Sequence, residues 1–394
     1  MKNSNFIRIL KNTPFYTKIQ TMNIQMVDLL SQYKKIKTEI DSQIEKVILS
    51  SVFVKGGRVV EFEENLKDYL DVEHVISCGN GTDALQIALM ALDLKENDEV
   101  ITTPFTFVST LEVLALMKLK PVLVDVDPNS FNIRPDLINR KIDHHTKAII
   151  PVHLYGQCSD METLNEIARG NNLFIIEDAC QALGTEYIFK NGMTAKAGTI
   201  GDIACNSFFP TKNLGSFGDG GAIYTNNHEL AKKMRSIANH GMSQRYYYQQ
   251  IGINSRLDAI QAAILDVKLK YLDQYILDRQ AAAAFYDREL AGIQEIAIPA
   301  RVSYSSHTFH QYTIKVPERR DELQQFLRSK NIPSMIYYPL PLHLQEAYQY
   351  LGYQKGDFPV AEELSEQVLS LPMHTELTDE QLNYIVSAIR EFFN

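Results

Sequence analysis

Short apolar runs alternate with helical patterns through the middle of the chain. Seven runs are rich in Val and Ile: HVISC (74–78), EVITT (99–103), PVLVDVD (121–127), KAIIPVHL (147–154), LFIIED (173–178), DIACNSFF (202–209) and GAIYT (221–225). Helical patterns such as 83–94 and 161–169 separate them. Buried strands that alternate with helices are typical of a mainly parallel sheet covered on both faces. The pattern predicts an α/β fold with a seven-stranded sheet.

Helical patterns also precede and follow this region. An apolar stripe at three- and four-residue steps predicts a helix over 33–47. A second amphipathic segment runs from Gly56-Gly57 to about residue 70, and one long helical pattern leads out of the sheet region from about residue 255.

The C-terminal part has a different pattern. We expect a strand at 311–316, a helix at 321–330 and an extended stretch at 333–341. Thr378 and Gln381 form a capping-box signature for a last helix that ends at Phe393. The chain is therefore predicted to have an N-terminal extension (1–25), a large domain (26–270) and a smaller C-terminal α+β domain (271–394).

Composition narrows the class of protein. The 394 residues include 39 Lys and Arg against 48 Asp and Glu, so the formal net charge is −9. A general basic surface for nucleic acid is therefore excluded. The four cysteines lie far apart with no CxxC pair, which favours reduced thiols over a disulfide framework or a zinc site, and no metal is expected.

The N-terminal segment carries basic residues and no acid, but we do not interpret it as a targeting signal. Arg8 interrupts its apolar stretch, and no small-residue cleavage site follows. Met22 is an alternative start. No apolar run approaches the roughly 18 residues that a membrane-spanning helix needs. We expect a cytoplasmic protein without membrane contact.

Two segments carry possible ligand chemistry at the ends of predicted strands. In SCGNGTDAL (77–85), a glycine-rich turn opens a helix, which suits either a phosphate site or a plain tight turn. LFIIEDACQALG (173–184) ends a buried strand with Glu177 and Asp178. This acid pair could hold Mg²⁺, be satisfied by a helix N-terminus, or bind a protonated ring nitrogen.

A single lysine stands out in SFFPTKNLGSFGDGGA (207–222). Lys212 lies in a turn between two apolar runs and is either a solvated surface cation or a Schiff-base lysine. A phosphate-type turn, a strand-end acid and a lysine between strands together match the three anchors of pyridoxal phosphate. Their combination favours the second interpretation.

The order of the motifs resembles the DegT/DnrJ/StrS family of pyridoxal-phosphate-dependent aminotransferases, which act on nucleotide-linked keto sugars. The resemblance covers about residues 24–394 and rests on GNGTDALQ, TPFTFVST, IPVHLYGQ, IIEDACQALG, SFFPTKNLG, GDGGA and NSRLDAIQAAIL. It implies the fold type I aminotransferase architecture. It also implies a homodimer with shared active sites and L-glutamate as the amino donor.

The resemblance assigns roles residue by residue. Lys212 would bond the cofactor aldehyde and then move the proton, and Asp178 would pair with the pyridine nitrogen. Gln181 would hydrogen-bond the ring hydroxyl, and Phe107 would stack on the ring unless it is a core residue. The phosphate would be bound by Gly81, Thr82 and Ser207, together with Asn254 from the partner subunit. For Ser207 the alternative is a small strand residue, and for Asn254 a turn former.

NSRLD (254–258) is similar to members that aminate C3, and to the UDP-2-acetamido-2-deoxy-hexuluronate aminotransferases of surface polysaccharide synthesis. Arg256 would then bind the substrate carboxylate across the dimer, or else form an intersubunit salt bridge. Tyr337 departs from that subgroup, where His can occur, and leaves dTDP-3-keto-6-deoxyhexoses as alternative substrates. His310, Tyr338 and His343 are the remaining candidates for substrate contact.

Two other functions fit the sequence less well. A related 3-dehydratase would carry histidine in place of Lys212, so the lysine counts against it. A regulator that binds cofactor without turnover would have no need to retain Lys212, Asp178 and Gln181 together. The exposed-looking run Tyr246-Tyr247-Tyr248 is expected in a loop, either at the substrate cleft or in dimer packing.

Overall fold

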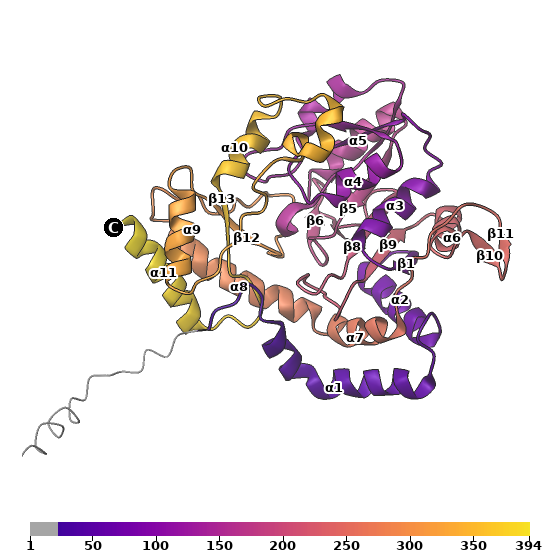
Figure 1. Ribbon diagram of the computed structural model, residues 1–394, viewed down its shortest axis with the longest axis horizontal. Coiled ribbons are helices and arrows are strands. Elements are labelled where there is room, and N and C mark those ends of the chain that lie inside the picture. Colours follow the sequence, from indigo (N-terminus) through magenta and orange to yellow (C-terminus); the bar gives the residue numbers. More distant parts are fainter. Residues whose placement is uncertain (1–22) are drawn as a thin grey trace, which may run out of the picture.

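A seven-stranded sheet forms the centre of the protein, whose computed structural model describes residues 23–394 (Figure 1). Its strands are ordered β1-β9-β8-β5-β4-β2-β3. They are β1 (His74–Cys78), β2 (Glu99–Thr102), β3 (Lys120–Leu123), β4 (Thr146–Ile149), β5 (Phe174–Asp178), β8 (Ile203–Ser207) and β9 (Gly221–Thr225). Each predicted apolar run contributes one strand. Only β9 runs antiparallel to its neighbours, so the mainly parallel α/β sheet is confirmed.

Helices cover both faces of this sheet because neighbouring residues of each strand point to opposite sides. On β8, for example, Ile203 and Cys205 pack on one face and Ala204 on the other. The first face carries α3 (Gly81–Ala91), α4 (Ser109–Leu116) and α6 (His228–Ile237). The second carries α2 (Gly57–Leu70), α5 (Met161–Asn171) and α7 (Ala259–Leu269).

The N-terminal stripe forms α1 (Leu29–Ser50), which lies along α7 and buries Ile36, Ile40 and Val47 (Figure 1). The prediction of a single long helix from about residue 255 is wrong. The segment is divided into α7 and α8 (Leu272–Leu290), and α8 leads from the core that it shares with α7, where Leu272 and Ile276 lie, into the C-terminal core. Leu265 of α7 packs beneath the sheet, whereas Tyr286 of α8 packs in the C-terminal core.

The C-terminal core is built on a two-stranded antiparallel sheet of β12 (Tyr312–Lys315) and β13 (Val368–Leu371). It is covered by α8, α9 (Arg320–Ser329) and α11 (Asp379–Phe393), and α10 (Pro359–Gln367) leads into β13. The predicted capping box is present, since Gln381 N donates to Thr378 Oγ1 and Thr378 N donates to Gln381 Oε1. The strand β13 was not predicted.

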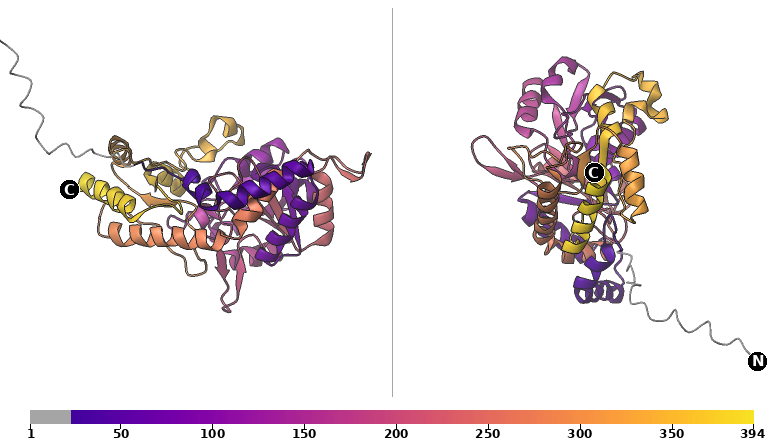
Figure 2. Two further views of the ribbon diagram at one scale, coloured as in Figure 1. Left: turned by 90° about the horizontal axis from the view of Figure 1, so that it is seen from below. Right: turned by 90° about the vertical axis from the view of Figure 1, so that its left-hand side faces the viewer.

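In the part of the chain that the structure describes, two small hairpins lie outside both sheets. One is β6 (Glu186–Ile188) with β7 (Thr194–Lys196), and the other is β10 (Met242–Gln244) with β11 (Tyr247–Tyr248). The tyrosine run expected in a loop is therefore part of a hairpin, which projects from the body in both Figure 1 and Figure 2. Short 3₁₀ helices span Pro135–Leu137, Asn139–Lys141, Leu154–Gly156, Leu342–Leu344 and Glu346–Leu351.

Three expectations concern the chain as a whole. Within residues 23–394, none of the helices has the length and apolar content needed to cross a bilayer. All four cysteines are free thiols. The expected N-terminal extension, including the alternative start at Met22, lies almost entirely outside the described residues.

Candidate active site

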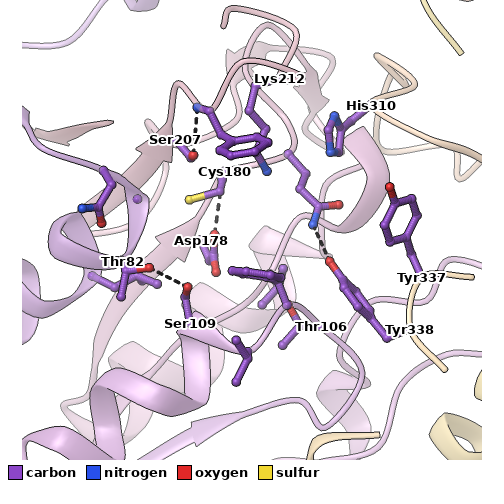
Figure 3. A pocket seen from close by; sticks show the side chains of 18 of the residues that line it. Thr82, Thr106, Ser109, Asp178, Cys180, Ser207, Lys212, His310, Tyr337 and Tyr338 are labelled. Atoms are coloured by element: carbon purple, nitrogen blue, oxygen red, sulfur yellow. Dashed lines mark hydrogen bonds between the residues drawn. The ribbon is translucent and has the colours of Figure 1, made fainter. Parts of the chain in front are cut away.

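A cavity of about 810 Å³ lies at the carboxyl ends of the central strands (Figure 3). Ligand sites of open α/β sheets are formed at this edge. Nine of the twelve candidate site residues line it: Gly81, Thr82, Phe107, Asp178, Gln181, Ser207, Lys212, His310 and Tyr338. The structure thus brings residues from widely separated parts of the chain together around one space.

Asp178 is the last residue of β5 and is buried at the floor of the cavity. Its Oδ2 accepts a hydrogen bond from Thr110 Oγ1 at 2.8 Å, and its Oδ1 accepts one from Cys180 N at 3.3 Å. No ion pair within residues 23–394 includes it. A buried carboxylate without a cation is costly, so the site is suited to a ligand that brings positive charge.

The neighbouring acid, Glu177, faces the other side of the sheet. It contacts His153 Nε2 at 2.8 Å and accepts hydrogen bonds from the backbone amides of Gly198, Ile200 and Gly201. Because the two carboxylates point to opposite faces, they cannot chelate one Mg²⁺ ion, and that alternative is excluded for this pair. Glu177 is a structural acid that ties the 198–201 loop to β5.

Lys212 lies in the turn after β8, and its side chain lines the same cavity as Asp178 (Figure 3). Burial lowers the pKa of Lys212 below its ordinary value, while Cys180 and Asp178 act in the opposite direction. A lowered pKa leaves more of the amine free to act as a nucleophile. The turn itself requires Gly215, where a Cβ would lie 2.2 Å from the carbonyl oxygen of Pro210.

Another lysine with a lowered pKa provides a contrast. Lys268 on α7 is almost fully buried, and burial lowers its pKa to about 8. Its Nζ donates to Gly215 O at 2.7 Å, and it does not line the cavity. Position at the cavity, and not the pKa alone, therefore distinguishes Lys212.

The start of α3 forms a cradle for an anion. Asn80 caps the helix by accepting from Asp83 N, and the first helical residues, Gly81 and Thr82, line the cavity with amides that have no intrahelical acceptor. Hydroxyls of Thr82 and Ser109 lie 2.6 Å apart beside it, and Ser207 lies at the end of β8 (Figure 3). These donors fit a phosphate group.

Gln181, Tyr338 and Phe107 form another part of the wall. Gln181 Oε1 accepts from Tyr155 N at 2.9 Å, and its Nε2 donates to Tyr338 OH at 3.1 Å. Phe107 is 55% exposed and its ring lies 6.4 Å from that of Tyr338. The alternative that Phe107 belongs to the core is therefore wrong, because its ring faces the cavity.

The two candidate histidines lie in different places. His310 is buried at the cavity wall, its Nδ1 has no hydrogen-bond partner within the described residues, and burial, with Lys212 and Arg279, lowers its pKa. His343 does not reach the cavity. Its Nε2 lies 3.0 Å from Glu362 Oε1 and its ring packs against Phe358, so the expected substrate contact by His343 is not supported.

Asn254 and Arg256 also lie outside this cavity, and their roles in a partner subunit's site stay predictions. Asn254 is exposed, and Arg256 Nη1 lies 3.4 Å from Asn239 Oδ1 at a separate, smaller cavity. The sequence reasoning missed Ser109 and Thr110, although the quoted motif TPFTFVST contains both. Hydroxyl residues that open a helix after β2 were a usable signal, because that helix begins at the same edge of the sheet.

The DegT/DnrJ/EryC1/StrS aminotransferase family model matches residues 34–390. A pleiotropic regulatory protein of Geobacillus stearothermophilus is 48% identical over 94% of this chain and 99% of the relative. The UDP-2-acetamido-2-deoxy-3-oxo-D-glucuronate aminotransferase of Pseudomonas aeruginosa is 42% identical over 93% of this chain and 99% of the relative.

Solved structures resemble this protein over nearly its whole length. DesV of Streptomyces venezuelae superposes with a TM-score of 0.91, is 36% identical, and matches 95% of this chain and 99% of that one. NtdA of Bacillus subtilis, solved with bound cofactor PMP, has a TM-score of 0.85 and is 32% identical, over 93% of this chain and 83% of that one.

Proposed function

This chain belongs to the DegT/DnrJ/EryC1/StrS aminotransferase family, and from that premise we propose that it transfers an amino group from L-glutamate to C3 of a nucleotide-linked 3-keto sugar. UDP-2-acetamido-3-keto-glucuronate is the favoured acceptor. The product would enter surface polysaccharide synthesis. The observation that carries the proposal is that Lys212 and Asp178 line one cavity with the start of α3.

The enzyme is a sugar aminotransferase, and its cofactor is pyridoxal phosphate. The cavity fits this group, because it offers a buried acid without a cation, a lysine with a lowered pKa and an anion cradle. In the proposed arrangement, Asp178 holds the ring nitrogen, Phe107 stacks on the ring, and Gly81, Thr82 and Ser207 bind the phosphate. When bound, the cofactor accepts the electron pair that a broken Cα–H bond leaves behind.

Residues of the chain would carry out the proton transfer and balance the charge of the ring. Lys212 would hold the cofactor through its amine, and the same amine would take a proton from the donor's Cα as a base and return it as an acid. Its lowered pKa keeps part of the amine neutral for the first of these steps. Thr110 and the Cys180 amide both donate to Asp178, which holds its carboxyl group in place beside the ring that it would pair with.

The acceptor is proposed from two observations. The P. aeruginosa relative acts on a UDP-linked 3-oxo-glucuronate derivative, and it matches nearly the full chain. Arg256 supplies a planar guanidinium that suits a carboxylate at C6. Tyr337, Tyr338 and His310 line the cavity and would contact the sugar.

We also propose a homodimer in which Asn254 and Arg256 complete the partner's site. Both residues lie outside their own cavity. Large apolar side chains are exposed nearby, among them Ile251 at 85% and Tyr247 at 65%. An apolar surface of this kind on a single subunit is typical of an interface.

The experiment is a pair of half-reactions on the holoenzyme. Glutamate should bleach the yellow absorbance of the cofactor, and adding UDP-2-acetamido-3-keto-glucuronate should restore it. A dTDP-3-keto-6-deoxyhexose is the control acceptor. If only that control restores the absorbance, the hexuluronate assignment is wrong. Persistent yellow absorbance with glutamate would instead favour the regulatory role named for the Geobacillus relative.

A further inference from the structure

A second cavity, of about 180 Å³, carries a local excess of positive charge. Lys55, Arg235 and Arg256 line it, and Glu63 is the only acid that does so among the residues described. This contrasts with a chain whose formal net charge is −9. Three cations around one carboxylate leave two positive charges without a counterion at this place.

The single acid, Glu63, forms an ion pair with Arg235. Glu63 Oε2 contacts Arg235 Nη1 at 2.8 Å, while Glu63 Oε1 accepts from Ser77 N and Ser77 Oγ at 2.9 and 2.7 Å. The other guanidinium nitrogen of Arg235 donates to Val75 O at 2.8 Å. Arg235 and Glu63 thus form a structural pair, and neither can neutralise the remaining cations.

Lys55 and Arg256 are the two cations that remain. Within residues 23–394, Lys55 makes no ion pair or side-chain hydrogen bond, and Arg256 has only a long contact of 3.4 Å to Asn239 Oδ1. Burial lowers the pKa of Lys55 and the charges of Arg256 and Arg235 lower it further, in accord with like charges held near one another.

The backbone holds Lys55 at this position. Val54 forms an antiparallel bridge with Asp258, and Ala259 N donates to Phe53 O at 2.9 Å, so the segment before α2 is fixed to the start of α7. Lys55 itself has a left-handed φ of 60°. That conformation is unfavourable for a residue with a side chain, and it persists where surrounding contacts impose it.

We propose that Lys55 and Arg256 form one anion-binding site for the nucleotide sugar, with Lys55 as a further substrate-binding residue. This inference rests on the proposed function, in which Arg256 reaches the partner's substrate. The bridge between Val54 and Asp258 joins the segment that carries Lys55 to the segment that carries Arg256. Both side chains would therefore reach the same substrate. The ligand is an anionic oxygen group, either the C6 carboxylate or the diphosphate.

The test is calorimetric binding of UDP-glucuronate and UDP-glucose to the holoenzyme, since the two differ at C6 and share the diphosphate. We expect Lys55→Met to weaken UDP-glucuronate binding by roughly tenfold, the loss of about one hydrogen bond to a charged group. Lys55→Arg should restore binding. Selective loss of UDP-glucuronate binding identifies the carboxylate, and equal loss for both nucleotides identifies the diphosphate.

Lys355→Met is the matched control, because Lys355 is exposed and lines neither cavity. Unchanged affinity of Lys55→Met for both nucleotides would overturn the inference, as would an equal effect of the control. Size-exclusion chromatography of each variant separates a binding defect from a loss of assembly. The glutamate half-reaction on the unmodified enzyme tests the proposed function separately, so a failure of one is distinguishable from a failure of the other.

Discussion

Substituting Gly81 with alanine tests the anion cradle at the start of α3. The added Cβ would lie 2.8 Å from Ser207 Cβ and 3.0 Å from Cys180 Sγ, whereas carbon atoms in contact are normally about 3.5–4.0 Å apart. Ser207 Cβ is attached directly to β8 and cannot swing away. The helix start and the strand end must therefore separate, at a cost of about 1–3 kcal/mol for overpacking.

If this cost falls on phosphate binding, the Kd for pyridoxal phosphate rises by about 5- to 150-fold, since about 1.4 kcal/mol corresponds to a factor of ten. The assay is an absorbance titration of the apoenzyme with the cofactor. A urea unfolding curve without cofactor measures how much of the cost falls on the fold instead.

Gly170→Ala is the control, because nothing lies within 4 Å of a Cβ at that helical position. It should leave cofactor affinity unchanged and stabilise the fold by about 0.4–1 kcal/mol. Wild-type cofactor affinity in Gly81→Ala would refute the idea that this glycine shapes the cradle.

Three other substitutions test separate parts of the account. Lys212→Ala should fold and bind the cofactor noncovalently but fail to turn over, as followed by absorbance and product formation, and normal turnover would overturn the mechanism. Thr378→Ala removes the capping box of α11 and should cost about 1 kcal/mol of unfolding free energy, measured in urea. Burial raises the pKa of Glu177, but His153 and the amides of Gly201 and Gly198 lower it overall, so its stabilising effect is present at neutral pH and lost as the pH falls below 4.5. Glu177→Gln should therefore be less stable at pH 7 and show a weaker loss of stability on acidification, and an unchanged pH profile would contradict this role.

The sheet could be predicted because its strands are buried on both faces. Runs such as LFIIED must be apolar throughout, and this signal does not depend on long-range contacts. The strand β13, with the sequence VLSL, lacks turn residues that would separate it from α10, so it was missed. The division between α7 and α8 falls at Lys270 and Tyr271, where neither a glycine nor a proline marks it, so no local pattern reports it.

The site was predicted in part for a similar reason. Strand ends and helix starts gave Asp178, Lys212 and Gly81, which share one cavity. The sequence does not show which of Glu177 and Asp178 faces that cavity, because a shift of one residue exchanges the two faces of a strand. The position of His343 could not be predicted either. Its partner Glu362 lies on α10, 19 residues further along the chain, and no sequence pattern indicates that the two residues are in contact.

Trapping the cofactor on the protein is the most direct test of the central claim, because burial lowers the pKa of both Lys212 and Lys268. The holoenzyme is reduced with borohydride, digested, and its peptides are mapped by mass spectrometry. The account predicts that the pyridoxyl phosphate mass lies on Lys212. The same mass on Lys268 or another lysine, or its absence from every peptide, would contradict it.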